Sequence, residues 1–207
     1  MSNVFIITGY TGSAGLKAAR IADKDNILVI TAKIIEELED AKTALEAEGR
    51  EIHTFAADFS VKKEAHAVFA QANLLGKIKN VIHIPEPLPE TAEIETIIRT
   101  HMIETKNVNM EARKYMDEGG SIVDFAFEKS AEIPDVLIKP QIFEKAEYEE
   151  DEFLTHMTRE PNMAVGTDNK TTFAYALSTT FIEWYAQKCA EEYAAQGINV
   201  VCEEMRV

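Results

Sequence analysis

Three glycines occupy every third position between two apolar segments near the start of the chain. Between the apolar run Val4–Ile7 and the alanine-rich run Leu16–Ala22, the sequence reads Thr8-Gly9-Tyr10-Thr11-Gly12-Ser13-Ala14-Gly15. A glycine turn that leads from a strand into a helix leaves free N–H groups at the helix start, where the helix dipole favours anions. Gly9 permits a tight turn, Gly12 lets the main chain approach a pyrophosphate, and Gly15 lets the helix lie against the strand. The segment predicts an α/β domain with a dinucleotide phosphate site contacted by Thr8 to Gly15.

The same segment also has a simpler interpretation, a tight strand-to-helix turn that holds no ligand. Its GxxGxxG spacing differs from the more familiar GxGxxG, and short glycine motifs arise by chance. If a phosphate binds, the Ser13 hydroxyl adds a donor, and Tyr10 and Thr11 line the rim of the site. Both interpretations predict the same local fold.

Strand and helix patterns alternate along the rest of the chain, which indicates a Rossmann-like, doubly wound parallel sheet in three layers. We expect about six strands, at Val4–Thr8, Ile27–Thr31, Glu51–Ala56, Asn80–Ile84, Ser121–Phe125 and Asn199–Cys202. We expect helices at Ser13–Ile21, Ile34–Ala47, Lys62–Leu74, Ala92–Met116 and Thr172–Ala195. Several of these helices have glycine at or just beyond their ends, as is common at helix C-termini.

One segment departs from this alternation. Residues 128–170 contain three prolines and the acidic run Glu147-Tyr148-Glu149-Glu150-Asp151-Glu152. We interpret the segment as a long loop inserted into a single domain of residues 1–207, and loops of that length are usually functional or mobile. The acidic run predicts a solvated face rather than a binding site.

Size and charge restrict the partners of this chain. Its 207 residues suit one domain with a substantial core, and 46% hydrophobic with 28% charged residues is ordinary for a globular protein. A net charge of −15 argues against nucleic acid and anionic membranes as partners, because both attract clustered Lys and Arg. Cys189 and Cys202 follow no metal-ligand spacing, so we expect reduced cysteines, no metal site and a cytoplasmic location, with no targeting or membrane segment.

Four landmarks occur in the order found in the short-chain dehydrogenase/reductase family, which this chain resembles over its whole length. The glycine segment is similar to the family's TGxxGxxG or TGxxxGxG cofactor loop. The second landmark is Ala57-Asp58, which is similar to the acidic position that contacts adenine. The third is Gly119-Gly120-Ser121-Ile122-Val123, which resembles the family's GGSIV motif. The fourth has two parts: Phe173-Ala174-Tyr175-Ala176-Leu177-Ser178 resembles AYSAS, and Gly197-Ile198-Asn199-Val200 resembles GIRVN.

The resemblance implies a Tyr acid/base at Tyr175, but the residues that support it in the family are missing. The family's lysine position holds Thr179, and its serine position aligns with Ala126 or Phe127. A phenol without a neighbouring cation titrates near pH 10, so little would bring it toward neutral operation. The family's asparagine position aligns with His101, which could relay protons or be structural. Our candidate catalytic residues are therefore Tyr175, Thr179 and His101.

The turn after the fourth strand also departs from the family. The family's NNAG turn under the cofactor is replaced by His83-Ile84-Pro85-Glu86-Pro87, in which two prolines remove N–H donors. We count His83 and Ile84 as cofactor contacts and consider His83 with Glu86 as a substitute acid/base pair. The chain ends at Val207, where family members continue into a seventh strand, so we expect less support for the nicotinamide.

Lys33 is the one clue to cofactor choice. The second strand is followed by Thr31-Ala32-Lys33, with no acid for a ribose and a lysine where the family often has a 2′-phosphate-binding arginine. This favours NADP(H) slightly over NAD(H), although a solvent-exposed lysine in the first turn of a helix explains it equally well.

Two functions remain open on this evidence. One is an NAD(P)-dependent oxidoreductase acting on a small carbonyl or alcohol substrate through an atypical site. The alternative is a catalytically inactive dinucleotide-binding sensor or structural subunit. The aromatic residues of the last helix exceed what one buried face needs, and family members pair through this region, so we expect a homodimer or homotetramer. The alternative is that the sheet buries one side of this helix and the acidic insertion buries the other.

Overall fold

The computed structural model describes residues 2–9, 12–86, 92–128, 132–163 and 170–205. Six parallel strands form one sheet in the order β3-β2-β1-β4-β5-β6. The strands are β1 (Asn3–Thr8), β2 (Ile27–Ala32), β3 (Ile52–Ala56), β4 (Lys77–His83), β5 (Ser121–Phe127) and β6 (Asn199–Met205). The order reverses between β1 and β4, which places the glycine turn at the point where parallel α/β sheets bind ligands.

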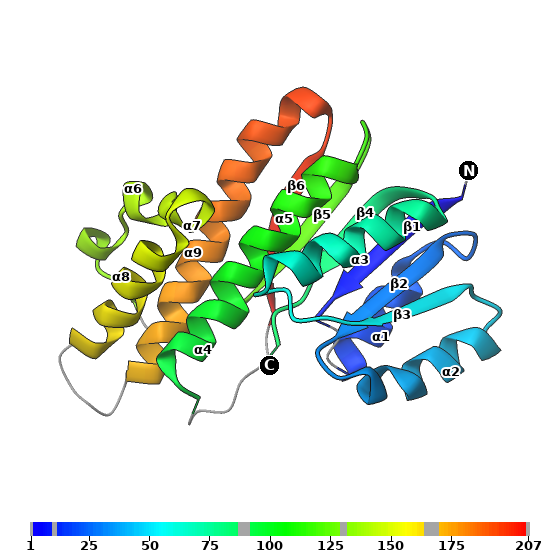
Figure 1. The fold of residues 1–207 in the computed structure, drawn as a ribbon, viewed down its shortest axis with the longest axis horizontal. Coiled ribbons are helices and arrows are strands. Elements are labelled where there is room, and N and C mark those ends of the chain that lie inside the picture. Colours follow the sequence, from blue (N-terminus) through cyan, green and yellow to red (C-terminus); the bar gives the residue numbers. More distant parts are fainter. Residues whose placement is uncertain (1, 10–11, 87–91, 129–131, 164–169, 206–207) are drawn as a thin grey trace.

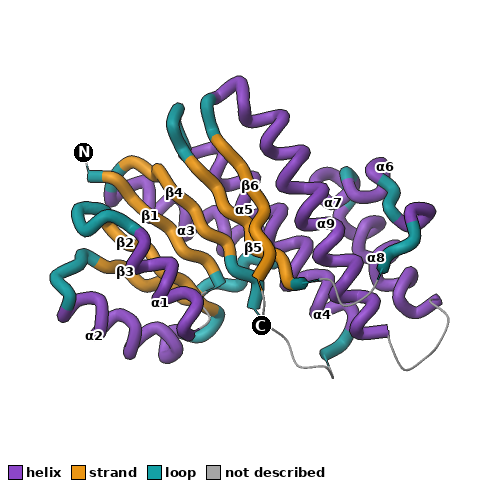
Figure 2. The backbone as a smooth tube through the Cα atoms, turned by 180° about the vertical axis from the view of Figure 1, so that it is seen from behind, coloured by secondary structure: helices purple, strands orange, loops and turns teal. Residues whose placement is uncertain are grey.

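Helices cover the two faces of the sheet unequally (Figures 1 and 2). On one face lie α3 (Lys62–Leu75), α5 (Glu104–Tyr115) and α9 (Lys170–Tyr193). On the other lie α1 (Gly12–Ile21) and α2 (Glu39–Ala47), which are packed over β1, β2 and β3. The two hydrophobic clusters follow this division, because one contains the buried residues of α3, α5 and α9 and the other those of α1 and α2. The expected doubly wound α/β fold is confirmed.

The helix expected at Ala92–Met116 is interrupted. It consists of α4 (Ile94–Ile98), a π-helical turn at Arg99–Ile103 and then α5. A π-helical turn inserts one residue into the ladder of backbone hydrogen bonds, and such turns often occur at functional sites. His101 lies in the middle of this turn.

The segment expected to be a long loop is largely helical where it is described. It forms α6 (Pro140–Phe143), α7 (Lys145–Tyr148) and α8 (Glu150–Met163), so the prediction of a loop at 128–170 is wrong for most of its length. Pro140 occupies the first turn of α6, where a missing N–H costs nothing, and Pro161 lies in the last turn of α8. α6 and α7 have four residues each and are too short to produce an apolar period, whereas α8 buries Phe153, Leu154 and Met157 at helical spacing.

The inserted helices cover the aromatic side of α9. Phe143 contacts Phe181 and Trp184, with ring centroids 5.4 and 5.3 Å apart, and Phe153 contacts Phe181 at 5.3 Å. The aromatic bulk on which we based an oligomer is therefore buried within the chain. The expected homodimer or homotetramer loses that argument and stays a prediction.

The acidic run is exposed at four of its six residues, as expected for a solvated face, but Glu147 and Glu150 also contact neighbouring helices. Glu147 accepts hydrogen bonds from Lys188 at 2.9 Å and from the Tyr185 hydroxyl at 2.8 Å, both on α9. Glu150 pairs at 2.7 Å with Lys106, a buried lysine of α5. A buried ammonium needs such a partner, so these two carboxylates attach the insertion to the helices beside it.

Candidate functional site

Two glycines of the turn, Gly9 and Gly12, have positive φ. Gly9 has φ of 66°, and a Cβ there would overlap the carbonyl oxygen of Ile84, so glycine is required by both backbone angle and space. Gly12 has φ of 48° and begins α1, with no heavy atom within 4 Å of the position a Cβ would take. Gly15 is buried in α1. Tyr10 and Thr11 lie outside the described residues.

The residues that flank the turn are tied to β4. The Thr8 hydroxyl is 2.8 Å from Nδ1 of His83, and the Ile84 N–H donates to the Thr8 carbonyl at 3.0 Å. His83 is buried, and burial together with nearby His101 lowers its pKa to about 3, so its imidazole is neutral. Ser13 and Ala14 lie in the first turn of α1, beside the open space at Gly12. His83 and Ile84 thus hold the glycine turn in place through their bonds to Thr8.

Lys33 is exposed, but its ammonium group contacts two carboxylates. Its Nζ lies 3.0 Å from Oε1 of Glu104 and 3.7 Å from Oε2 of Glu86. It also donates to the Thr100 hydroxyl at 3.2 Å. Lys33 follows β2 and Glu104 begins α5, so this ion pair crosses the carboxyl end of the sheet. Lys33 is thus both exposed to solvent and paired with Glu104, so the solvent-exposed interpretation is not contradicted.

This ion pair occupies a small cavity at the adenosine end of the site. The cavity has a volume of about 10 Å³ and is lined by Gly9, Ala32, Lys33, Glu37, Ala57, Phe59, Glu86 and Glu104. That is about the space of one water molecule, far less than a purine needs. Burial, only partly offset by Lys33, raises the pKa of Glu104 to about 8. Burial opposes the Lys33 charge, but Glu104 outweighs it and the pKa of Lys33 is raised.

Asp58 serves the turn into α3. Its Oδ1 accepts a hydrogen bond from the Ser60 N–H at 2.9 Å, and its own N–H donates to Glu64 at 2.7 Å. Its charge also helps to raise the pKa values of Lys33 and Glu104. A contact from Asp58 to adenine stays a prediction.

The expected acid/base pair of His83 and Glu86 does not form. His83 bonds to Thr8, whereas the Glu86 carboxylate faces Lys33. The Glu86 carbonyl instead lies 3.1 Å from Nε2 of His101. Because Pro85 fixes the backbone between them, the two side chains leave the end of β4 in different directions.

His101 is buried and held on both sides of its ring. Burial lowers its pKa to about 4, so Nε2 carries the proton donated to Glu86 and Nδ1 accepts. The Ser178 Oγ lies 3.0 Å from Nδ1 of His101 and 2.8 Å from the carbonyl oxygen of Tyr175. Its single proton is shared between these two acceptors. A neutral, fully bonded imidazole supplies no cation.

The three aromatic rings at the reaction end of the site contact one another. The His101 ring centroid is 5.0 Å from that of Tyr175 and 5.2 Å from that of Phe127, and the Phe127 and Tyr175 centroids are 6.1 Å apart. We call this group the aromatic cluster. Phe127 ends β5, where the family places its serine, and is nearly buried. Rings occupy the place where a substrate oxygen would meet hydroxyl groups.

Thr179 does not replace the family's lysine. It is buried, and its hydroxyl donates to the Phe127 carbonyl at 2.9 Å. Lys188 pairs with Glu147 and Glu192, and Lys170 donates to Asn162. Of the three candidate catalytic residues, the structure brings Tyr175 and His101 together, whereas Thr179 stabilises the backbone of β5.

A polar chain continues inward from the aromatic cluster. The Thr105 hydroxyl donates to the His101 carbonyl at 2.6 Å, and Asn109 donates to the Thr105 carbonyl at 3.0 Å. The Asn109 amide also donates to both oxygens of Asp124, at 3.0 and 2.8 Å. Burial raises the pKa of Asp124 to about 7. No feature of the sequence indicated this buried carboxylate.

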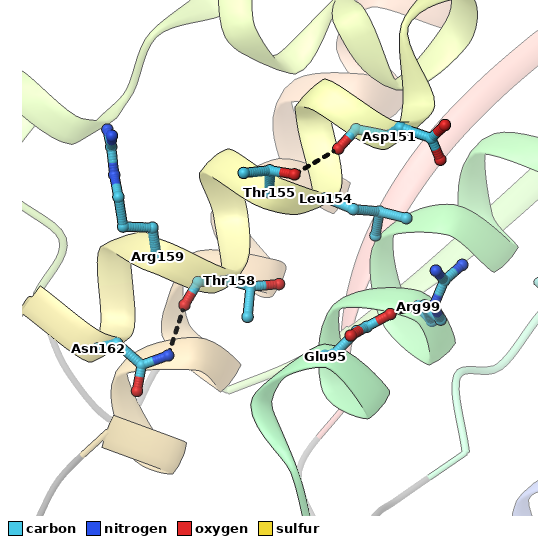
Figure 3. A pocket seen from close by; sticks show the side chains of 8 residues that line it. All are labelled: Glu95, Arg99, Asp151, Leu154, Thr155, Thr158, Arg159 and Asn162. Atoms are coloured by element: carbon cyan, nitrogen blue, oxygen red, sulfur yellow. Dashed lines mark hydrogen bonds and ion pairs between the residues drawn. The ribbon is translucent and has the colours of Figure 1, made fainter.

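The larger pocket of about 520 Å³ lies elsewhere, between α4 and α8 (Figure 3). Arg99 bonds to Glu95 at 2.8 Å, and the Thr155 and Asn162 side chains bond to backbone carbonyls of α8. It contains no residue that the sequence predicted for the site.

Sequence reasoning missed Glu104, Thr100 and Phe59. Glu104 lies in a helix pattern with other polar residues and has no motif around it. The one available signal was its place just after the helix position aligned with the family's asparagine. Among the described residues, no group of three or more His, Cys, Asp or Glu side chains can hold a metal ion, and no helix is long and apolar enough to span a membrane.

Comparison with solved structures identifies the fold. No protein-family model and no curated protein sequence matches this chain. A short-chain dehydrogenase from Mycobacterium smegmatis is similar with a TM-score of 0.70 and 14% identity, over 100% of this chain and 76% of that one. A citronellol catabolism dehydrogenase from Pseudomonas aeruginosa has a TM-score of 0.68 and 18% identity, over 97% and 72%. A short-chain dehydrogenase from Rhodopseudomonas palustris has a TM-score of 0.69 and 14% identity, over 98% and 84%.

This chain has the fold of the short-chain dehydrogenases/reductases. The resemblance inferred from the four sequence landmarks is confirmed at the level of the fold.

Proposed function

We infer that this protein binds a nicotinamide dinucleotide and does not carry out the hydride transfer typical of its fold. The observation that carries this inference is the contrast within one site. The space at Gly12 is open and the backbone there is shaped for a phosphate, whereas the aromatic cluster fills the reaction end. The oxidoreductase activity expected from the sequence stays untested, and the geometry favours the alternative of a binding protein.

The residues at the phosphate end fit a pyrophosphate. Gly12 and Ser13 present the first N–H groups of α1, a ten-residue helix whose dipole adds positive potential. The acidic surface of this chain contributes no long-range attraction, so these local donors carry the binding. A bound dinucleotide supplies a hydride donor or acceptor, but among the described residues the family's lysine and serine positions hold Thr179 and Phe127.

An adenosine would fit at the other end of the proposed site only after the Lys33 side chain separates from Glu104. The cavity there is close to 10 Å³, and the Lys33 side chain is what a ribose would displace. A 2′-phosphate offers Lys33 a new anionic partner, whereas a ribose 2′-hydroxyl does not. We therefore propose that the protein prefers NADP(H) to NAD(H), with Lys33 as the discriminating residue.

A second candidate is an oxidoreductase in which His101 assists Tyr175. It rests on the 5.0 Å contact between the two rings and on the Ser178 hydroxyl beside them. This candidate predicts turnover of ketones or alcohols that Tyr175→Phe abolishes. The binding function predicts no turnover in the same assay.

The test is calorimetric titration with NADPH and NADH, together with a matched pair of glycine variants. Gly12 and Gly49 both have positive φ and open space at the Cβ position, but Gly49 lies in the turn after α2. Gly12→Asp places an anion at the phosphate site and should lower affinity about a hundredfold, whereas Gly49→Asp should change it less than about twofold. Equal affinity in both variants, or no binding by the unaltered protein, would overturn the proposal.

Cys189 and Cys202 do not form a disulfide with each other. We retain the cytoplasm as the proposed location, to be checked by fractionation.

A further inference from the structure

In the part of the chain that the structure describes, no helix lies over the half of the sheet formed by β4, β5 and β6 on the face that α1 shares (Figure 2). All-parallel sheets normally have both faces covered, because their strands are apolar on both sides. Ile82, Val123 and Val201 are neighbours in register across the three strands and therefore share a face. Val123 contacts the hydrophobic cluster of α1 and α2, which places this row on the open face.

This open face contains an apolar hollow. The hollow measures about 330 Å³ and is lined by Ser13, Ala14, Lys17, Ala18, Ile21, Ile82, Ile84, Phe125 and Met205. Ile21, at its edge, is 76% exposed and lies beside the other apolar residues that line the hollow. A protruding side chain and a recess thus lie next to each other on one surface.

Opposite charges lie on the two sides of this hollow. Lys17 projects from α1, and Glu203 lies on β6 in register with Phe125, on the same face. Both are exposed, and neither has an ion-pair partner among the described residues. A surface with one cation and one anion on opposite sides of an apolar centre is complementary to a copy of itself rotated by a two-fold axis.

We propose that a second copy of this chain docks on the open face of β4, β5 and β6. In this dimer Ile21 of each copy enters the hollow of the other, and Lys17 of each copy lies opposite Glu203 of the second copy. A foreign peptide of one charge sign would meet a like charge on one side of the hollow. In the two-fold arrangement, the charges on both sides of the hollow lie opposite charges of the other sign.

This surface differs from the one that the sequence indicated. The aromatic side of α9 is already covered by α6, α7 and α8, whereas the open face is not covered by any described segment. The dimer does not involve the aromatic cluster or Lys33, although Ser13 and Ala14 belong to both the hollow and the proposed phosphate site. Its test measures molar mass without nucleotide, so a failure of the dimer is distinguishable from a failure of nucleotide binding.

The first test measures molar mass by light scattering and sedimentation equilibrium. The unaltered protein should be a dimer, and Ile21→Asp should weaken the dimer at least about tenfold because it places a charge in the hollow. The matched control is Leu74→Asp, since Leu74 is 78% exposed on α3, on the other side of the sheet. A monomeric unaltered protein, or a dimer that Leu74→Asp disrupts and Ile21→Asp does not, would overturn the proposal.

The second test reverses the charges. Lys17→Glu and Glu203→Lys should each weaken the dimer about threefold to tenfold, and the double variant should recover most of the loss. Neither position contacts the core, so the single variants should fold, which circular dichroism checks. If the two single effects add in the double variant, the proposed pairing of Lys17 with Glu203 is wrong.

Discussion

The two ends of the site on this sheet differ in what their residues accomplish. At the proposed phosphate end the backbone itself would form the site, through Gly9 beside the Ile84 carbonyl and Gly12 at the start of α1. At the reaction end side chains determine the site, and His101, Phe127 and Tyr175 are packed ring against ring. A backbone-defined feature lasts as long as the fold does, whereas side-chain chemistry is lost by single substitutions that improve packing.

The largest effect is expected at Gly9. Gly9→Ala adds a Cβ that overlaps the Ile84 carbonyl and forces φ of 66° on an L-residue, so we expect a loss of about 3 to 4 kcal/mol in the free energy of unfolding. Gly49→Ala is the control, because it has φ of 81° but open space, and should cost about 1 kcal/mol. Chemical denaturation measures both. Equal losses in the two variants would mean that the close approach of Gly9 to the Ile84 carbonyl does not contribute to the free energy of unfolding.

The next effect concerns the aromatic cluster. Phe127→Ser restores the hydroxyl that the family has at this position, yet it removes a nearly buried ring, so we expect a loss of about 3 kcal/mol and no turnover. Phe127→Leu keeps most of the volume and should cost less than about 1.5 kcal/mol. Unfolding curves and NADPH oxidation assays distinguish the cases. Turnover in the serine variant would show that the serine hydroxyl is the one group that the site lacks for hydride transfer.

A smaller effect is expected from Lys33. Lys33→Ala removes the partner proposed for a 2′-phosphate, so the preference for NADPH over NADH should fall about tenfold. Lys42→Ala, in α2, serves as the surface control. A preference that survives in Lys33→Ala would assign discrimination to another residue.

The pH dependence of binding sharpens the same comparison. Glu104 has a folded pKa of about 8 against 4.5 unfolded, so the folded chain retains a proton that the unfolded chain has lost between these values. Its contribution to stability is full below pH 4.5 and is lost as the pH rises through 8. Ionised Glu104 also holds Lys33 more firmly, so NADPH affinity should fall severalfold from pH 7 to 9. Calorimetry of Glu104→Gln should show a flat profile over that range, and a profile like that of the unaltered protein would exclude Glu104.

The smallest effect is expected from Tyr175→Phe. Because the ring contributes packing to the aromatic cluster, NADPH affinity should change less than about twofold. Titration of this variant beside the unaltered protein provides the measurement. A large loss of affinity would place the Tyr175 hydroxyl in contact with the nucleotide.

Local patterns were sufficient for the fold. The apolar periods of the six strands and their helices depend on neighbours in sequence, and the glycine positions depend on backbone angles, so both could be predicted. Strand ends were less accurate, since β5 continues to Phe127 and β6 to Met205, beyond their most apolar residues. The division into a single domain of residues 1–207 stays a prediction.

The candidate site was predictable only in part. The replacement of the family's lysine by Thr179 and of its serine by Phe127 was visible in the sequence, but the bond from Thr179 to the Phe127 carbonyl was not. The proposed pairing of His83 with Glu86 was wrong because neighbours in sequence can turn to different partners. The contacts of the insertion were not predictable because acidic residues look the same in a sequence whether they face water or a buried lysine.

The sequence by itself determined a parallel α/β sheet, a glycine turn suited to a phosphate, and the absence of the family's supporting catalytic residues. Only the tertiary structure decided that Lys33 reaches Glu104, that His101 and Phe127 enclose Tyr175, and that Glu147 and Glu150 attach the insertion. The physical reason is the range of the interactions. Periodicity and backbone angles act within a few residues, whereas these ion pairs and ring contacts join groups that only the folded sheet brings together.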